Sequence, residues 1–179
     1  EAESWAASWL GRRGLRRPVA LAPAARHATK RWPEPRWIEL LERLAAAGRS
    51  VVVFSLESER RELAELARRV EGGPRMAWCT ESLARMAGLM SGCVAAVTCD
   101  SGLMHVAAAR GLRVVALFGS TAPQLGFAPA GVGHVVLCRN EPCQPCALHG
   151  RDRCPLGHFH CMTRIESAAV WSALEPLLA

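Results

Sequence analysis

The densest group of side chains able to do chemistry lies in residues 97–105, VTCDSGLMH. An apolar run passes directly into Asp100, Ser101 and Gly102, at what would be the start of a helix, where backbone N–H groups are unpaired and the helix dipole is positive. His105 would lie about one turn further along the same helix. We therefore expect a phosphate here, with Asp100 accepting hydrogen bonds from sugar hydroxyls or backbone amides. The simpler alternative is a plain helix N-cap followed by a partly buried histidine.

A second candidate is the loop 23–34, PAARHATKRWPE, which holds Lys30, the only lysine among 22 Lys and Arg residues. A compact ammonium on a flexible stem suits a diphosphate as a mobile point charge. Trp32 and Pro33 would fix this loop to the following helix. The alternative is a solvated lysine next to a tryptophan that only packs.

Two shorter segments also end apolar runs with polar residues. Residues 55–59, SLESE, offer carboxylates at a position where doubly wound folds often hold ribose hydroxyls. Ser58 would cap the next helix, and Glu59 would only favour the helix dipole. In residues 118–123, FGSTAP, Thr121 would either donate to a phosphate or form part of a turn without further role.

The elements that must position these residues alternate along the chain. Short β-branched runs predict strands at Pro18–Ala22, Val51–Phe54, Val94–Cys99 and Val114–Phe118, with weaker ones at Arg75–Trp78 and His134–Leu137. Amphipathic segments before glycines predict helices at Pro35–Ala47, Ser58–Val70, Ser82–Met90 and Gly102–Arg110. The alternation predicts an α/β fold with a doubly wound, mainly parallel sheet, which binds ligands beyond the carboxyl ends of its strands.

The length of 179 residues, half of them hydrophobic, suits one domain. Residues 1–14 are interpreted as the remnant of an interdomain linker with a short helix, and residues 15–179 as the domain. We find no leader peptide and no apolar run of the roughly 18 residues that a membrane-spanning helix needs. We therefore expect a soluble domain cut from a longer protein. Ser167–Leu178 has helical spacing, with Pro176 disturbing its last turn.

The net charge of +6 favours an anionic partner, although many arginines alternate with glutamates as on an exposed helix face. A nucleic-acid-binding module is disfavoured, because the chain has no tyrosine and only 6% aromatic residues. An oxidoreductase of the dinucleotide-binding type is disfavoured, because no G-x-G-x-x-G follows the first predicted strand. An enzyme domain that holds a nucleotide sugar remains the favoured interpretation.

Three motifs, taken in order, resemble glycosyltransferase family 9, the ADP-heptose:lipopolysaccharide heptosyltransferases. They are Lys30-Arg31-Trp32-Pro33, Asp100-Ser101-Gly102-Leu103-Met104-His105 and Phe118-Gly119-Ser120-Thr121-Ala122-Pro123. The resemblance spans nearly the whole chain and implies the C-terminal, donor-binding half of a GT-B glycosyltransferase similar to the heptosyltransferase II type. It implies inverting transfer of heptose from ADP-heptose to the lipopolysaccharide inner core without a required cofactor. The carboxylate base would come from an N-terminal acceptor domain that is absent here, so this chain alone would bind a nucleotide but not transfer sugar.

The resemblance also implies roles at the phosphate end of the donor. Lys30 would contact the diphosphate, with Ser101, Gly102 and His105 on its other face, and Asp100 would contact the heptose. The implied partners are a nucleotide-diphosphate sugar and the lipopolysaccharide acceptor, with no nucleic acid. A different nucleotide sugar is the alternative donor. The implied location is the cytoplasm, with peripheral association at the cytoplasmic face of the inner membrane.

Further roles concern the rest of the donor. By the same resemblance Glu57 would bind the ribose, residues near Glu81 would line the adenine pocket through backbone groups, and Thr121 would belong to the donor site. Ala25 and Arg26 depart from the small hydroxyl or glycine residues common in the family. The phosphate contacts of that loop therefore need not follow the family pattern.

Four of the eight cysteines cluster in a loop at 138–164, namely Cys143, Cys146, Cys154 and Cys161. A structural zinc is one interpretation, although the second spacing is longer than in zinc knuckles and ribbons. Reduced packing thiols and a disulfide are the others, and a cytosolic location disfavours the disulfide. Family members of the heptosyltransferase II type have a similar Cys-Pro-rich stretch, which makes it a family feature without assigning its chemistry.

Overall fold

Six short apolar segments form one parallel sheet in the computed structural model, which describes residues 1–179. The strands are β1 (Val19–Ala22), β2 (Val51–Phe54), β3 (Met76–Cys79), β4 (Ala95–Cys99), β5 (Val114–Phe118) and β6 (Val135–Cys138). Their order is β3-β2-β1-β4-β5-β6, and every neighbouring pair is parallel. The predicted doubly wound α/β fold is confirmed. Its crossovers change direction between β1 and β4, the place where such sheets leave a crevice for a ligand.

All six strands start within one residue of their predicted positions. The four central strands are buried along their whole length, as parallel strands covered on both faces must be. The edge strands β3 and β6 are mostly half-buried, and their apolar patterns are correspondingly weaker.

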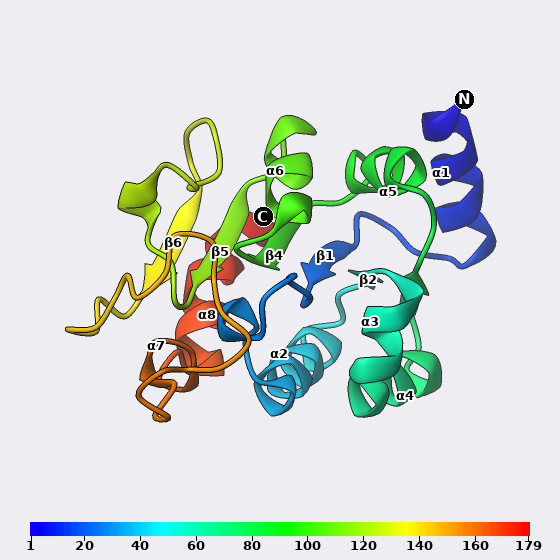
Figure 1. The fold of residues 1–179 in the computed structure, drawn as a ribbon. Helices are drawn as coiled ribbons and strands as arrows, with labels where there is room; N and C mark the ends of the chain where they lie inside the picture. The colour runs from blue at the N-terminus through cyan, green and yellow to red at the C-terminus, as the bar shows by residue number, and fades with distance from the viewer.

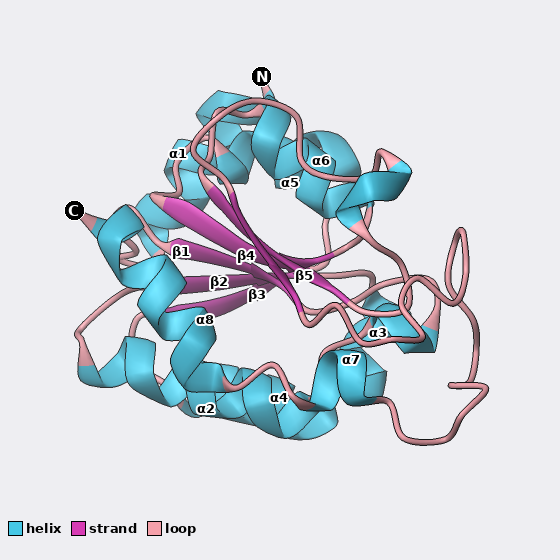
Figure 2. Cartoon of the chain, turned by 90° about the vertical axis from the view of Figure 1, so that its left-hand side faces the viewer, coloured by secondary structure: helices cyan, strands magenta, loops and turns pink.

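Helices cover both faces of the sheet (Figures 1 and 2). One layer contains α2 (Glu34–Ala46), α4 (Ala64–Gly72) and α8 (Ser167–Leu174), and the other contains α1 (Ala2–Arg12), α5 (Leu83–Met90) and α6 (Gly102–Ala109). Alternate side chains of each strand point to opposite layers, so Val19 and Leu21 join one core while Ala20 joins the other. The two cores together fix the strand ends that carry the polar loops.

The segment Ser58–Val70, expected as one helix, consists of α3 (Glu57–Glu62) and α4, which are separated at Leu63. No residue of α3 is buried, whereas Leu66 and Val70 of α4 enter the core, so the break turns the apolar face inward. The expected cap at Ser58 is wrong, because α3 starts one residue earlier and Leu56 is its N-cap.

The glycines after the helices behave in two ways. Gly48 and Gly111 adopt φ angles of 68° and 79°, the left-handed conformation that ends a helix. Helix α4 also ends where expected, with Gly73 as its C-cap, but Gly73 has a φ of −91° and so ends the helix in extended backbone.

The first residues contribute to the core. Helix α1 packs on α5 and buries Ala6, Trp9 and Leu10. A Cβ added to Gly88 of α5 would lie 2.8 Å from the carbonyl oxygen of Ala2, so the two helices are in close contact. The interpretation of residues 1–14 as a linker stays a prediction, but their helix belongs to the layer that covers the sheet.

The end of the chain follows the predicted pattern. Helix α8 passes into a 3-10 turn, η3 (Glu175–Leu178), which contains Pro176. Between β6 and α7 (His160–Thr163), residues 139–159 form no helix or strand, and this segment makes up most of the Cys-rich loop. Two further 3-10 turns, η1 (Ala28–Lys30) and η2 (Pro123–Leu125), follow β1 and β5. None of the helices has the length and apolar character needed to span a bilayer.

Candidate functional site

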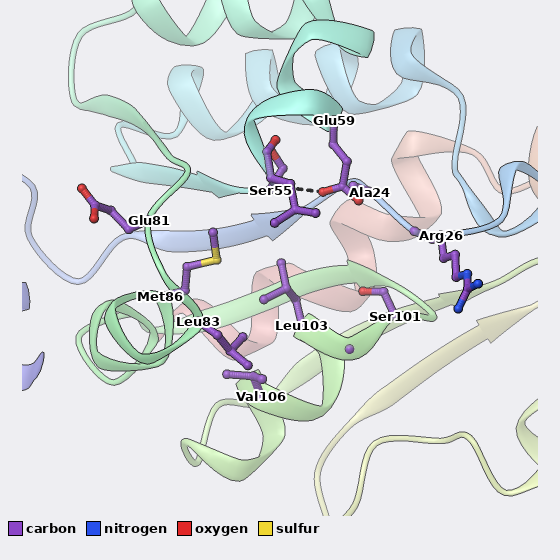
Figure 3. Close-up of a pocket in the computed structure, with 13 residues that line it drawn as sticks. Ala24, Arg26, Ser55, Glu59, Glu81, Leu83, Met86, Ser101, Leu103 and Val106 are labelled. Carbon is purple, nitrogen blue, oxygen red and sulfur yellow. Dashed lines mark hydrogen bonds between the residues drawn. The ribbon is translucent and has the colours of Figure 1, made fainter.

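A pocket of about 290 Å³ opens beyond the carboxyl ends of β1, β2 and β4 (Figure 3). Its walls come from the loops after β1, β2 and β3 and from the first turns of α5 and α6. The lining residues are Ala24, Ala25, Arg26, Ser55, Leu56, Glu59, Glu81, Leu83, Met86, Ser101, Gly102, Leu103 and Val106. The pocket therefore lies at the predicted edge of the sheet, next to the point where the crossovers change direction.

One part of the pocket is an apolar wall. Leu83 and Met86 from α5 meet Leu103 and Val106 from α6, and Leu56 adds a further apolar side chain. Leu56 and Leu83 remain 61% and 60% exposed. Large apolar side chains exposed inside a concave site favour a ligand that covers them, and a flat nucleotide base has the right shape and polarity.

The opposite part of the pocket is suited to an anion. Ser101 has extended backbone and is the N-cap of α6, which begins at Gly102. The Ser101 Oγ atom is buried without a hydrogen-bond partner, and such an atom calls for a ligand or a water. A Cβ added to Gly102 would meet nothing within 4 Å, so a phosphate has room to approach the backbone.

A buried ion pair borders this anion site. The Nζ atom of Lys30 lies 2.8 Å from Oδ2 of Asp100, and the Thr121 hydroxyl donates to the same oxygen at 2.7 Å. The Asp100 side chain is 3% exposed and that of Lys30 is 14% exposed. Because Asp100 directly precedes Ser101, the only lysine and the start of α6 meet at one edge, as predicted. The ammonium is nevertheless bound to Asp100, and Lys30, Asp100 and Thr121 lie beside the pocket lining and not within it.

Of three further predicted site residues, one lines the pocket and two lie outside its lining. Glu81 lines the pocket, with its carboxylate 2.7 Å from Arg85. Glu57 lies outside the lining and pairs with Arg60 at 3.5 Å, and His105 is exposed on α6, also outside the lining.

Sequence reasoning missed Glu59, which does line the pocket. Its carboxylate accepts a hydrogen bond of 2.8 Å from the backbone N–H of Leu56, which turns the side chain back over the loop after β2. The spacing of a leucine N-cap and a glutamate three residues later was the available signal, because it fits the reciprocal half of a capping box.

The Cys-rich loop packs against the loops that carry Lys30 and Thr121. The backbone N–H of Thr29 donates to the Arg151 carbonyl at 3.0 Å, and the Arg151 N–H donates back to the Thr29 hydroxyl at 2.8 Å. The Thr29 hydroxyl also lies 2.7 Å from that of Ser120. The side-chain amide of Gln144 donates to the carbonyl of Thr121 at 3.1 Å. The loop thus fixes the backbone on both sides of the buried ion pair.

Four cysteines of this loop, Cys143, Cys146, Cys154 and Cys161, surround a second, small cavity together with His158. All eight cysteines of the chain are free thiols. No group of three or more His, Cys, Asp or Glu side chains in the structure is arranged to hold a metal ion. The structural zinc stays a prediction, which elemental analysis of freshly purified protein tests: less than about a tenth of an equivalent of zinc or iron would contradict it.

The thiols of this cluster differ in acidity. Burial raises the pKa of Cys154, but backbone N–H groups that face its sulfur outweigh burial and lower the pKa below that of an ordinary thiol; they belong to Phe159, Leu156, Gly157 and His158. Burial raises the pKa of Cys161 to about 12. Cys154 is therefore the thiol of the two that ionises more readily near neutral pH.

The sheet order defines a domain of the Rossmann-like α/β class, and its apolar wall and the start of α6 form a pocket suited to a nucleotide. Comparison with known proteins gives a narrower assignment. The pattern of the family described as "Glycosyltransferase family 9 (heptosyltransferase)" matches residues 5–156. The chain belongs to glycosyltransferase family 9, and the predicted resemblance is confirmed.

Individual relatives agree with this assignment. The chain is 41% identical over 123 residues to lipopolysaccharide heptosyltransferase 1 of Pseudomonas aeruginosa, covering 66% of this chain and 33% of that protein. It is 34% identical over 111 residues to lipopolysaccharide heptosyltransferase 2 of Salmonella typhimurium, covering 59% and 32% of the two chains. The chain thus spans about a third of the length of these relatives.

Solved structures show the same fold. The E. coli ADP-heptose lps heptosyltransferase II superimposes with a TM-score of 0.79 at 25% identity, covering 99% of this chain and 51% of that one. A family 9 glycosyltransferase from Veillonella parvula superimposes with a TM-score of 0.81 at 22% identity, with the same coverage. The fold of this chain is therefore the one found in the glycosyltransferases of the family.

Proposed function

We propose that this chain is the donor-binding domain of an inverting glycosyltransferase that moves heptose from ADP-heptose to the lipopolysaccharide inner core. Family membership and the names of the relatives support heptosyl transfer. The E. coli heptosyltransferase WaaC, which shares the fold, was solved with ADP. The observation that carries the proposal is the single pocket in which an apolar wall faces an anion-accepting helix start.

The pocket suggests how a nucleoside diphosphate sugar lies. The base packs against Leu83 and Leu103, and the diphosphate lies at Ser101 and Gly102, where N–H groups and the helix dipole favour negative charge. The ribose then falls near the loop after β2, where Glu59 takes the role first expected of Glu57.

The buried ion pair suits the sugar end of the donor. Lys30 and Thr121 both contact Oδ2 of Asp100, and no hydrogen bond is present at Oδ1. Oδ1 can therefore accept a hydrogen bond from a sugar hydroxyl next to the diphosphate. Lys30 holds the carboxylate in the orientation needed for that contact.

A transferase that uses another nucleotide-diphosphate sugar is the second candidate. The wall that would meet the base is made of apolar side chains, which stack on adenine, guanine or uracil alike. The base is therefore the least determined part of the proposal.

Thermal unfolding with ADP, GDP and UDP tests the proposal. A ligand that binds only the folded state raises the unfolding temperature, and we expect ADP at millimolar concentration to raise it most. Gly102→Ala places a methyl group in the phosphate space and should abolish the shift while the protein stays folded. Gly11→Ala is the matched control, because a Cβ there also meets nothing within 4 Å but lies in α1, away from the pocket. Indifference to all three nucleotides would contradict the proposal, and a larger response to UDP would change the donor.

The proposed function implies a place of action in the cytoplasm. Eight free thiols fit a reducing compartment. The net charge of +6 would favour peripheral association with an anionic inner-membrane surface, which co-sedimentation with anionic and neutral vesicles tests.

A further inference from the structure

Lys30 is already paired with Asp100 and is not a free cation. Its ammonium is bound to a carboxylate that is itself 97% buried, since Asp100 is 3% exposed. Its stem is also confined, because a Cβ added to Gly150 of the Cys-rich loop would lie 2.9 Å from Lys30 Cδ. Lys30 therefore holds the Asp100 carboxylate, and any N–H that it can still donate to a phosphate acts from this fixed position.

Arg26 has the opposite properties. It lines the pocket, its side chain is exposed, and it takes part in no hydrogen bond or ion pair in the structure. It is also the only lysine or arginine in the pocket lining. Its guanidinium is therefore the positive charge in the pocket lining that has no ion-pair partner.

The backbone before Arg26 is fixed even though its side chain is free. Ala24 and Ala25 are 6% and 2% exposed, and the Nε–H of Arg31 donates to the Ala25 carbonyl at 2.7 Å. The Arg26 side chain can therefore change its conformation while the backbone that carries it stays in place. Such an arrangement lets one side chain follow a ligand group without disturbing the loop.

The position of Arg26 indicates which part of the ligand it meets. Figure 3 shows Arg26 and Ser101 at one end of the pocket and Glu81 at the other. Arg26 therefore stands at the end that contains the unpartnered Ser101 Oγ and the start of α6. A planar guanidinium can bind two phosphate oxygens at once, which suits a diphosphate between Arg26 and the helix.

We propose that Arg26 neutralises charge on the diphosphate of the bound nucleotide, while Lys30 positions Asp100. This inference rests on the proposed function, because it assumes a nucleoside diphosphate in the pocket. It assigns a charged role to a position where the family more often has a small residue. Affinity should then depend on the number of ligand phosphates through Arg26.

Calorimetric titration of the 179-residue chain with ADP, AMP and adenosine tests this role. In Arg26→Ala we expect the Kd for ADP to rise about tenfold or more, a smaller rise for AMP and no change for adenosine. Arg26→Gln keeps much of the side chain but not the charge, and should behave in the same way. Added salt should weaken ADP binding by the unmodified chain more than binding by either variant.

Arg16→Ala is the matched control, because Arg16 is also exposed and free of ion pairs but lies before β1, at the opposite edge of the sheet. It should leave all three Kd values unchanged. If the unmodified chain binds ADP and both Arg26 variants bind it within twofold of the same Kd, the role of Arg26 is wrong and the proposed function stands. If the unmodified chain binds none of ADP, GDP and UDP, both proposals fail.

Discussion

Asp100 shows how much a single buried carboxylate can hold in place. One of its oxygens contacts both the Lys30 ammonium and the Thr121 hydroxyl, which come from the loops after β1 and β5. The residue therefore joins three loops at the edge of the sheet. Its charge matters more than its shape, because the cation that it neutralises is itself largely buried.

We expect Asp100→Asn to destabilise the fold by about 3 kcal/mol, because the Lys30 ammonium would remain buried without a counter-charge. Urea unfolding followed by circular dichroism measures this. Arg68→Gln is the control, since Arg68 and Glu65 form an exposed pair 2.5 Å apart whose loss should leave the unfolding midpoint unchanged. Equal unfolding midpoints for Asp100→Asn and the unmodified chain would contradict this prediction, because the Lys30 ammonium would then not depend on the charge of Asp100.

Cys154 is the residue for which chemical reactivity can be predicted. Its pKa is lowered by backbone N–H groups despite burial, whereas burial raises the pKa of Cys99 and Cys161 to about 12. Because the thiolate is the reactive form, we expect iodoacetamide at pH 8 to modify Cys154 before those two. The rate should rise with pH and level off at a lower pH than for a free thiol.

Peptide mass mapping after short exposure measures the order of modification. In the variant Cys154→Ser the modification at position 154 should be absent, and the labelling of Cys99 and Cys161 should be unchanged. Equal labelling of Cys154 and Cys161 in the folded protein would contradict the assigned difference in acidity.

At the scale of elements, apolar periodicity determined most of what could be predicted. The runs that became β2 and β5 were predicted with their observed bounds, because buried parallel strands leave a continuous apolar signature. The helix break at Leu63 could not be predicted, since residues 58–70 keep one helical period and the break depends on packing against the core. The Cys-rich loop has no periodicity, and its contacts with Thr29 and Ser120 are visible only in three dimensions.

The site was predictable where a residue stands directly at a strand end. Asp100, Ser101 and Lys30 were expected to lie together, and they do, because their loops must share one edge of a parallel sheet. Glu57 and Glu59 lie on different sides of the short helix α3. The residue at which this helix begins determines which side each one occupies. The resemblance pointed to Glu57, and the orientation of α3 that places Glu59 in the pocket lining is visible only in the structure.

Gly119, in the turn after β5, tests how tightly the elements around the site are joined. A Cβ there would lie 2.4 Å from the carbonyl oxygen of Thr29 and 3.0 Å from Met162 Cγ. We expect Gly119→Ala to push the loop of Lys30 away and to destabilise the fold by about 2 kcal/mol. Differential scanning calorimetry measures the effect, with Gly11→Ala, where nothing lies within 4 Å, as the control without loss of stability. Similar unfolding temperatures for the two variants would mean that the two loops move apart without cost.

For the whole molecule, nucleotide binding and sugar transfer should be separable. The carboxylates at the pocket are already engaged: Glu59 with the Leu56 N–H, Glu81 with Arg85, and Asp100 with Lys30. The resemblance to the family implies that the carboxylate base which takes a proton from the acceptor hydroxyl lies in an N-terminal acceptor domain. We therefore expect the 179-residue chain to bind ADP but to release none from ADP-heptose when acceptor is added. A coupled assay for ADP measures this, and turnover by the chain alone would show that it contains a working base.

The attachment of the Cys-rich loop has a consequence for how the molecule melts. Residues 139–159 have no ladder of helix or strand hydrogen bonds of their own, yet they fix Thr29 and Thr121 through a few contacts. Segments of this kind open locally at lower free energy than a central sheet. On warming, the affinity for the nucleotide should therefore fall while the sheet is still folded. Amide hydrogen exchange should become faster first in residues 139–159.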